Sequence, residues 1–114
     1  MANKKSWLTF IIIVAIIIIS IFIIKNRGGN EVGDELAKCI ASKSELYVQK
    51  GCIHCKTQEE MFGSSFKYLK TTDCFYERET CAEKEITATP TWIINQQKIV
   101  GVQSIEKLKE LTGC

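Results

Sequence analysis

The chain begins with a long apolar run. From Leu8 to Ile24 only Thr9 and Ser20 are polar, and ten of these seventeen positions are isoleucine. A helix of that length spans roughly 25 Å, slightly less than the ~30 Å hydrocarbon core of a bilayer. Trp7 and the lysines on either side of the run suit the two membrane interfaces. The pattern predicts an uncleaved transmembrane anchor over residues 1–25.

A cleaved signal peptide is the alternative for this segment. The apolar run exceeds the usual 7–15 residues, and no small-x-small cleavage site follows it. The segment Leu36–Cys39 is only superficially similar to a lipoprotein site, because a lysine precedes its cysteine. These features favour the anchor.

The next polar and apolar positions predict a tether and then a helix. Residues 26–33 are polar or glycine apart from Val32, a composition typical of a flexible tether. Val32, Leu36 and Ile40 repeat every four residues and predict a helix over about Asp34–Ser42, with Asp34 as its N-cap.

The rest of the pattern alternates strands and helices, in the order α-β-α-β-α-β-β-α for the whole domain. This order predicts an α/β fold around one mixed sheet, in a single domain over residues 34–114. The expected elements are a strand at Leu46–Val48, a helix from Cys52 to near Gly63, a strand at Tyr68–Cys74, an exposed helix or loop at Glu77–Ile86, strands at Trp92–Ile94 and Lys98–Val102 joined by a turn at Asn95–Gln97, and a last helix with Ser104 as its cap, Ile105, Leu108 and Leu111 as its apolar stripe and Gly113 at its end.

Charge excludes one class of partner. The formal net charge of +2 comes from the segment around the apolar run, because residues 31–114 hold 11 basic and 13 acidic side chains. No basic patch remains to bind nucleic acid.

Cysteine usage indicates where the domain lies. All six cysteines follow the apolar run, and an even number in a small domain is typical of an oxidising compartment. The basic residues flanking the run are nearly balanced, so the cysteines decide the orientation. We expect a single-pass protein of the cell membrane with an extracytoplasmic domain.

The candidate chemistry lies in Cys52-Ile53-His54-Cys55. Two thiols at this spacing close into a small, easily broken disulfide. At the start of a helix the first thiol faces unpaired N–H groups, which favour its ionised form. Thr89-Pro90-Thr91 follows, just before two expected strands. The combination predicts a site of thiol–disulfide exchange that needs no cofactor other than its own disulfide.

A zinc site is the alternative for four of the cysteines. Cys52, Cys55, Cys74 and Cys81 supply four thiolates, but six residues separate the second pair, more than the usual two to four. The helix and proline context favours thiol exchange, and we expect no metal.

The chain from about Leu36 to Gly113 resembles the thioredoxin superfamily, and more specifically the thioredoxin-like domain attached to bacterial and plant homologues of vitamin K epoxide reductase. In those proteins the domain passes disulfides between a quinone-linked membrane partner and exported substrates. This sequence lacks the partner's four-helix domain and has one anchor instead, so the resemblance implies action in trans or with a different partner. The matching stretches are Leu46-Tyr47, Cys52 to Gln58, Met61-Phe62-Gly63, Asp73-Cys74, Cys81-Ala82, Pro90-Thr91-Trp92 and Val100 to Ser104.

The resemblance implies a thioredoxin-like fold and distinct roles for the two motif thiols. Cys52 is then the exposed attacking thiol and Cys55 the more buried resolving thiol. His54 stabilises the Cys52 thiolate and makes the pair a stronger oxidant; the alternative is that His54 is only a solvent-facing residue of the first helical turn.

The resemblance also implies a substrate-binding segment. The Thr89–Pro90 bond is expected to be cis and to lie against the disulfide, which leaves the Thr89 backbone free to pair with an extended substrate. The alternative is a trans proline that starts an edge strand. Ile53 and Thr91 are expected to contact substrate as well.

The pairing and roles of the other four cysteines are less defined. Cys74 and Cys81 match the family's second pair, as either a structural staple or a second redox pair that relays electrons to the membrane partner. Cys39 and Cys114 have no firm place in the family pattern. They pair with each other or stay free, or Cys114 forms an intermolecular disulfide.

The sequence departs from thioredoxins around the motif. Lys50 and Gly51 stand where thioredoxins have a tryptophan, and Lys50 and Lys56 favour a thiolate electrostatically. The first strand has no interior acid, so Glu45 is the only nearby candidate for a proton shuttle. This suits an oxidase or isomerase better than a fast reductase.

These features together predict an oxidase of exported cysteine-containing proteins, recharged by a quinone-reducing oxidoreductase of the membrane. The alternatives are an extracytoplasmic reductase or isomerase, and a non-catalytic metal-binding or assembly module.

Overall fold

The computed structural model describes residues 3–26 and 32–114. The chain divides into two compact units, Met1–Asn30 and Glu31–Cys114. Most of the expected tether at 26–33 lies outside the described residues.

The first unit contains one helix, α1 (Lys4–Asn26). Its large apolar side chains are exposed along its whole length, with Trp7 and Phe22 among them. By length and composition, Lys4–Lys25 is able to cross a membrane. An apolar surface of this extent is unfavourable in water and needs a cover.

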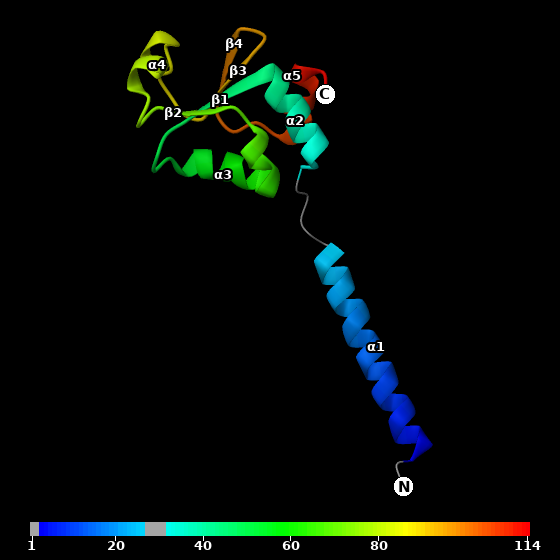
Figure 1. Cartoon of the computed structure of the whole chain (residues 1–114). Helices are drawn as coiled ribbons and strands as arrows, with labels where there is room; N and C mark the ends of the chain where they lie inside the picture. The colour runs from blue at the N-terminus through cyan, green and yellow to red at the C-terminus, as the bar shows by residue number, and fades with distance from the viewer. Residues whose placement is uncertain (1–2, 27–31) are drawn as a thin grey trace. The chain divides into compact units, whose positions relative to one another are not determined.

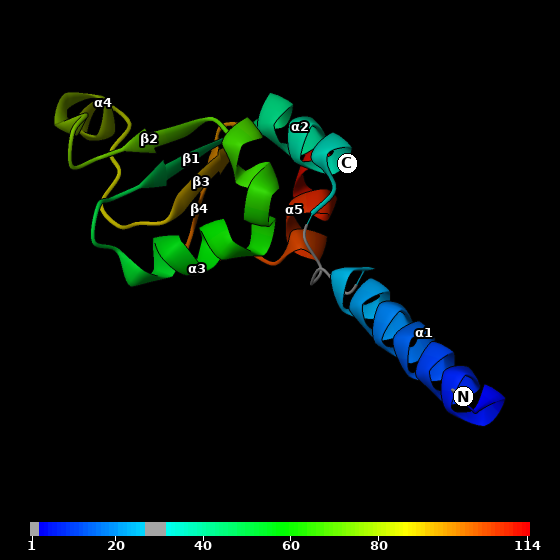
Figure 2. The same cartoon turned by 60° about the horizontal axis from the view of Figure 1, so that its bottom comes forward.

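The second unit is built on a four-stranded mixed sheet in the order β2-β1-β3-β4 (Figure 1). Strand β1 runs parallel to β2 and antiparallel to β3, which in turn pairs antiparallel with β4. Helices α2 and α5 lie side by side at one end of the sheet and α4 lies at the other (Figure 2). The elements are α2 (Asp34–Lys43), β1 (Ser44–Val48), α3 (Ile53–Phe62), the 3₁₀-helix η1 (Gly63–Tyr68), β2 (Thr71–Asp73), α4 (Arg78–Glu83), β3 (Thr91–Ile94), β4 (Gln97–Val100) and α5 (Ile105–Thr112). The predicted order of elements is confirmed.

The core lies on one face of the sheet. Leu46 of β1 stands opposite Trp92 of β3, and both are buried. Ile40 from α2, Phe62 from α3 and Leu108 from α5 pack into the same cluster. In β1, Glu45 is exposed between buried Ser44 and Leu46, whereas Tyr47, on the same face of the strand as Glu45, is buried.

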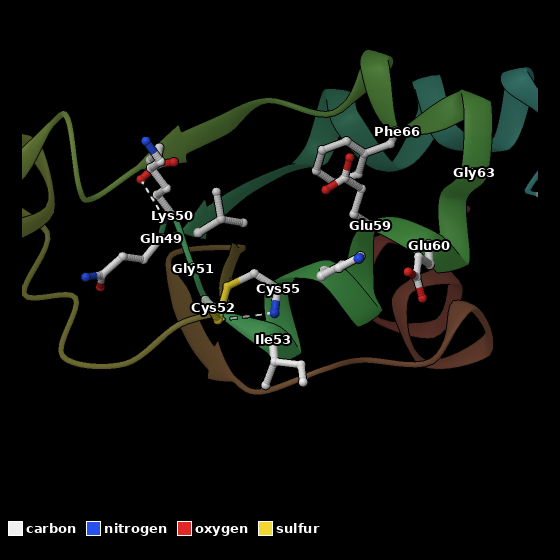
Figure 3. Close-up of a pocket in the computed structure, with 13 residues that line it drawn as sticks. Gln49, Lys50, Gly51, Cys52, Ile53, Cys55, Glu59, Glu60, Gly63 and Phe66 are labelled. Carbon is white, nitrogen blue, oxygen red and sulfur yellow. Dashed lines mark hydrogen bonds between the residues drawn. A yellow bond between two sulfur atoms is a disulfide. The ribbon is translucent and has the colours of Figure 1, made fainter.

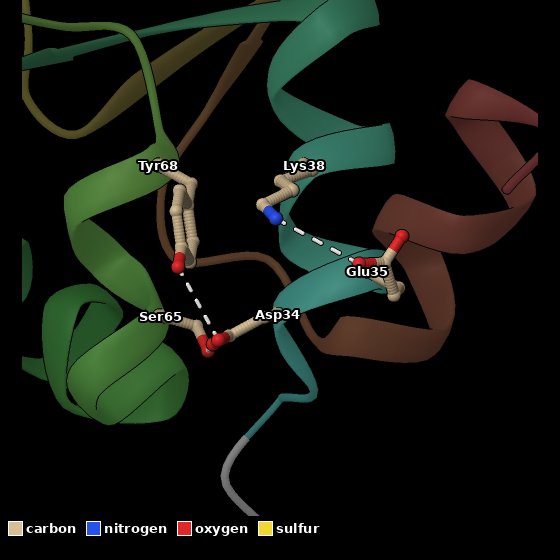
Figure 4. A network of polar contacts seen from close by, with 5 residues as sticks. All are labelled: Asp34, Glu35, Lys38, Ser65 and Tyr68. Atoms are coloured by element: carbon tan, nitrogen blue, oxygen red, sulfur yellow. Dashed lines mark hydrogen bonds and ion pairs between the residues drawn. The ribbon is translucent and has the colours of Figure 1, made fainter.

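The start of α2 differs from the prediction. Gly33, not Asp34, is the N-cap, and Asp34 is the first helical residue. The Asp34 carboxylate instead meets the η1 segment: its oxygens lie 2.7 Å from the Ser65 hydroxyl and 3.3 Å from the Tyr68 hydroxyl (Figure 4). These tertiary partners take the place of the local backbone N–H groups that an N-cap binds.

The predicted strand at Tyr68–Cys74 is wrong at its start. Gly63–Tyr68 forms η1, and the strand covers only Thr71–Asp73. Phe66 and Leu69 turn inward at a helical spacing of three, and the Leu69 N–H donates to the Phe66 carbonyl at 3.0 Å. Packing against α2 therefore overrides the apparent strand pattern.

The hairpin of β3 and β4 is shifted relative to the prediction. The turn uses only Asn95 and Gln96, both with positive φ (51° and 65°), so Gln97 already belongs to β4. Strand β4 ends at Val100, because Gly101 turns the chain with φ of 99°. The Gly101 N–H donates to the Pro90 carbonyl at 2.8 Å.

Candidate thiol–disulfide site

Cys52 caps the N-terminus of α3. Its backbone is extended, and its sulfur accepts a hydrogen bond from the Cys55 N–H at 3.2 Å. Gly51, with φ of 82°, turns the chain from β1 into this cap. The two cysteines form a disulfide with their Cα atoms 5.3 Å apart (Figure 3). The Cys52 sulfur therefore lies where the helix offers unpaired N–H groups and the positive end of its dipole.

The two sulfur-bearing residues differ in exposure. Cys55 is buried, with 6% of its surface exposed, whereas Cys52 is half-buried. An incoming thiolate consequently reaches Cys52 first. This asymmetry fits the roles expected for the two residues.

A proline loop lies against the disulfide. The Thr89–Pro90 peptide bond is cis. The Thr89 carbonyl oxygen lies 3.6 Å from the Cys52 sulfur, while Pro90 itself is buried. The structure thus brings together the two segments that the sequence analysis singled out.

The strand order, the disulfide at the start of α3 and the cis-proline loop define the architecture. The domain is a mixed α/β sheet with helices, and it has the helix-start disulfide and the cis-proline loop expected from the resemblance to the thioredoxin superfamily. The parallel strands β1 and β2 are joined through α3, and the hairpin of β3 and β4 is followed by α5.

Comparison with known proteins finds similarity to a curated plant protein. The sequence is 37% identical over 79 residues to the thiol-disulfide oxidoreductase LTO1 of Arabidopsis thaliana, covering 61% of this chain and 21% of that protein. The chain thus spans about a fifth of the relative's length. No family model matches the sequence.

Two solved structures resemble the fold, both from the alkylhydroperoxide reductase subunit AhpF of Enterococcus faecalis. Its N-terminal NTD_N/C domain matches with 21% identity and a TM-score of 0.45, and a C503A mutant of the subunit matches with 22% identity and a TM-score of 0.46. Each match covers 73% of this chain and 45% of the other.

Three further residues of the predicted site differ in their surroundings. Ile53 is 74% exposed beside Cys52 and offers apolar surface. The His54 side chain is exposed and makes no hydrogen bond or ion pair within the described ranges, so its effect on the thiolate stays a prediction. Thr91 is buried and its hydroxyl donates to the Ala88 carbonyl at 2.6 Å. The Thr91 side chain therefore braces the proline loop from inside, and a role for it in substrate binding also stays a prediction.

A cavity of about 690 Å³ opens beside the disulfide, between α3, η1 and the ends of β1 and β2 (Figure 3). Val48 and Phe66 contribute apolar surface to it. Its charged residues are the expected lysines, Lys50 and Lys56, together with the carboxylates Glu59, Glu60 and Asp73.

The carboxylates reduce the positive electrostatic potential that the two lysines create at the cavity. The Lys50 ammonium lies over the rings of Phe75 and Tyr76, at 5.5 and 5.7 Å from their centroids, and the Lys50 N–H donates to Asp73 at 3.1 Å. The positive field at the cavity is therefore weaker than the two lysines alone suggest.

The candidate proton shuttle lies at the surface. Glu45 is exposed, and its carboxylate accepts a hydrogen bond from the Tyr47 hydroxyl at 2.8 Å. Within the described ranges the buried polar residues are serine, threonine and glutamine. The described part of the domain thus holds no buried carboxylate beside Cys55.

The remaining cysteines form two disulfides. Cys74 pairs with Cys81, and Cys39 pairs with Cys114, so the four cysteines of the zinc alternative are joined as two separate pairs. The first bridge closes the loop that carries Phe75 and Tyr76. The second joins α2 to the end of α5.

One polar residue of the site region was missed by the sequence reasoning. Gln58 is fully buried in α3, three residues after Cys55. The signal was present, because Cys55, Gln58 and Phe62 fall on one helical face with two apolar members. A glutamine in such a stripe needs buried hydrogen-bond partners.

Proposed function

We propose that this protein is a thiol–disulfide oxidoreductase that introduces disulfides into exported proteins. The observation that carries the proposal is the Cys52–Cys55 disulfide at the start of α3, with the more exposed sulfur against the Thr89 carbonyl. The similarity to a protein named a thiol-disulfide oxidoreductase supports it.

The reaction proceeds by two exchanges. A substrate thiolate attacks the Cys52 sulfur, the Cys52–Cys55 bond breaks, and Cys55 leaves as a thiolate that takes up a proton. A second substrate thiolate then attacks the substrate sulfur of the mixed disulfide and releases Cys52 as a thiolate. The substrate loses two electrons, which the cysteine pair gains.

The expected stability of the Cys52 thiolate, the leaving group of the second exchange, supports the oxidising direction. In the reduced protein, the Cys55 N–H and the α3 dipole stabilise a Cys52 thiolate and so favour the reduced form of the pair. A pair whose reduced form is stabilised is a stronger oxidant. The lack of a buried carboxylate in the described domain fits this direction, because a fast reductase needs a group that deprotonates the buried thiol.

Continued turnover requires an oxidant. We assign this role to a quinone-reducing oxidoreductase of the membrane, of the vitamin K epoxide reductase type, which accepts two electrons from the reduced pair. Helix α1 anchors the protein in the same membrane, with the domain on the extracytoplasmic side. The apolar surface of α1 supports the membrane anchor.

The reduction potential of the Cys52–Cys55 pair tests the direction. The full chain in detergent micelles is equilibrated with glutathione buffers, and each cysteine pair is followed by mass spectrometry. We expect a value near or above about −180 mV, as in protein oxidases and isomerases. A value near about −270 mV would identify a reductant and reverse the proposed direction.

Activity tests the class of protein. The oxidised wild-type chain is mixed with a reduced two-cysteine peptide, and Cys52→Ser serves as the control. Oxidation by the wild type and none by the variant supports the proposal. A wild-type chain that leaves the peptide reduced contradicts it and favours a binding module.

A further inference from the structure

The side chain of Gln58 joins the two halves of the site. Its Oε1 atom accepts hydrogen bonds from the Trp92 indole N–H at 3.0 Å and from the Gln103 backbone N–H at 2.7 Å. Its Nε2 group donates to the Gln103 carbonyl at 3.0 Å and lies 3.5 Å from the Met61 sulfur. Both partners of Oε1 are obligate donors, so the orientation of the amide is fixed by its surroundings.

The contact with Gln103 has the form of a backbone pairing. The Gln58 amide both accepts from and donates to the same residue's main chain, as a peptide group does in a sheet. Burying an amide is costly unless its hydrogen bonds are made. Here all of them are made, so the residue fixes a geometry that an apolar side chain of the same volume cannot fix.

The partners of Gln58 lead directly to the proline loop. Trp92 lies two residues after Pro90 on β3. Gln103 lies two residues after Gly101, whose N–H donates to the Pro90 carbonyl at 2.8 Å. The Gln103 side chain also donates back to the Gly101 carbonyl at 3.2 Å. A chain of hydrogen bonds thus runs from α3, through Gln58 and Gln103, to the residue that follows Thr89.

We propose that Gln58 is a positioning residue, which holds the start of α3 at a fixed distance from the cis-proline segment so that a polypeptide substrate can bind that segment while its thiolate reaches Cys52. This inference rests on the proposed function. The inference predicts different rates for two kinds of reactant when Gln58 is replaced. A polypeptide needs both halves of the site in register, whereas a small dithiol needs only an exposed Cys52 sulfur.

The experiment compares these two reactants in single-turnover reactions of the full chain in detergent micelles. One is a synthetic peptide with two reduced cysteines, and the other is dithiothreitol. For Gln58→Leu we expect the peptide rate to fall by about tenfold or more, because a small misplacement of reacting groups is costly. We expect the dithiothreitol rate to change less than about twofold, since that reaction needs no positioned partner.

Ser65→Ala is the matched control. Ser65 is also buried and polar, but its hydroxyl contacts Val32 and Asp34 rather than the site. We expect its ratio of peptide rate to dithiothreitol rate to equal that of the wild type. An equal fall of this ratio in Ser65→Ala would assign the effect to general loosening and overturn the inference.

A second variant covers the case in which Gln58→Leu fails to fold. Gln58→Glu keeps acceptor oxygens for Trp92 and Gln103 but, when ionised, loses the donor to the Gln103 carbonyl. We expect its peptide-to-dithiothreitol ratio to be lowered at neutral pH and to recover toward the wild-type value as acid protonates the introduced carboxyl. A ratio equal to that of the wild type at every pH overturns the inference.

The outcomes separate the inference from the proposed function. A wild-type chain that does not oxidise the peptide contradicts the proposed function. A wild-type chain that does, with Gln58 variants that match it, leaves the function intact and removes the role of Gln58.

Discussion

The Cys52 sulfur lies 3.6 Å from the carbonyl oxygen of Thr89. Under the proposed function, a substrate main chain that pairs with the proline segment brings its thiolate beside the more exposed of the two sulfurs. Cys55 lies behind it, buried and one helical turn away. The roles of the two cysteines can be separated by trapping.

We expect Cys55→Ala to accumulate mixed disulfides between Cys52 and substrate proteins, because the resolving thiol is gone. Cys52→Ala should accumulate none. Non-reducing electrophoresis and mass spectrometry of the full chain under oxidising conditions identify the adducts. Adducts on Cys55 in Cys52→Ala, or none in either variant, would contradict the assigned roles.

His54 is exposed on the first turn of α3. We expect it to stabilise the Cys52 thiolate. Replacing it with alanine should make the potential of the Cys52–Cys55 pair more negative, by about 30 mV if the redox equilibrium changes tenfold. Equilibration with glutathione measures the shift. Thr57→Ala, exposed on the next turn, is the control. Equal potentials in His54→Ala and the wild type would leave His54 as a surface residue.

The Cys74–Cys81 bridge is expected to act as a staple. It closes a loop with a sequence separation of 7. Its removal in Cys74→Ala/Cys81→Ala should lower the free energy of unfolding by about 2–3 kcal/mol and leave the potential of Cys52–Cys55 unchanged. Urea unfolding in micelles and glutathione equilibration provide the two readouts. Unchanged stability combined with lost reoxidation by membranes would show a redox relay instead.

The Cys39–Cys114 bridge should stabilise more, because it spans a sequence separation of 75. The chain-entropy model gives about 4.5 kcal/mol for a loop of this size. The variant Cys39→Ala/Cys114→Ala tests this, with Cys74→Ala/Cys81→Ala as its comparison in the same urea series. A smaller loss for the longer loop would indicate that the reduced, unfolded chain keeps structure.

The Asp34 carboxyl should make the free energy of unfolding depend on pH in the acid range. The hydrogen bond with Ser65 holds the pKa of the Asp34 carboxyl below its ordinary value of 3.8. Because the folded pKa is the lower one, the stabilisation is complete above pH 3.8 and is lost as the pH falls through the folded pKa. Asp34→Asn should therefore lower the urea midpoint at pH 5–7, and the difference from the wild type should shrink below pH 3.8. A difference that is constant across this range would contradict the assignment.

The sequence predicted the order of elements because each one carries a strong local signal. Ser104 caps α5 by accepting from the Lys107 N–H, and Gly113 ends the helix in the left-handed region. The C-x-x-C at the start of α3 was placed to within one residue. Local chemistry of this kind needs no knowledge of distant contacts.

Three of the shortfalls depend on tertiary contacts. The Asp34 carboxylate binds Ser65, which lies 31 residues further along the chain, instead of capping its own helix. The pairing of Cys39 with Cys114 was left open because spacing alone does not determine it. The burial of Gln58 is explained by its hydrogen bonds with Trp92 and Gln103, which belong to two other segments of the chain.

The Cys39–Cys114 bridge also determines how the domain bears force. Tension applied between α2 and the end of α5 passes through one covalent bond, and the four strands carry none of it. Reduction of that single bond, followed by unfolding under tension, would release 75 residues, or roughly 250 Å of extended chain. In an oxidising compartment the domain is inextensible between these two points, whatever the stability of its sheet.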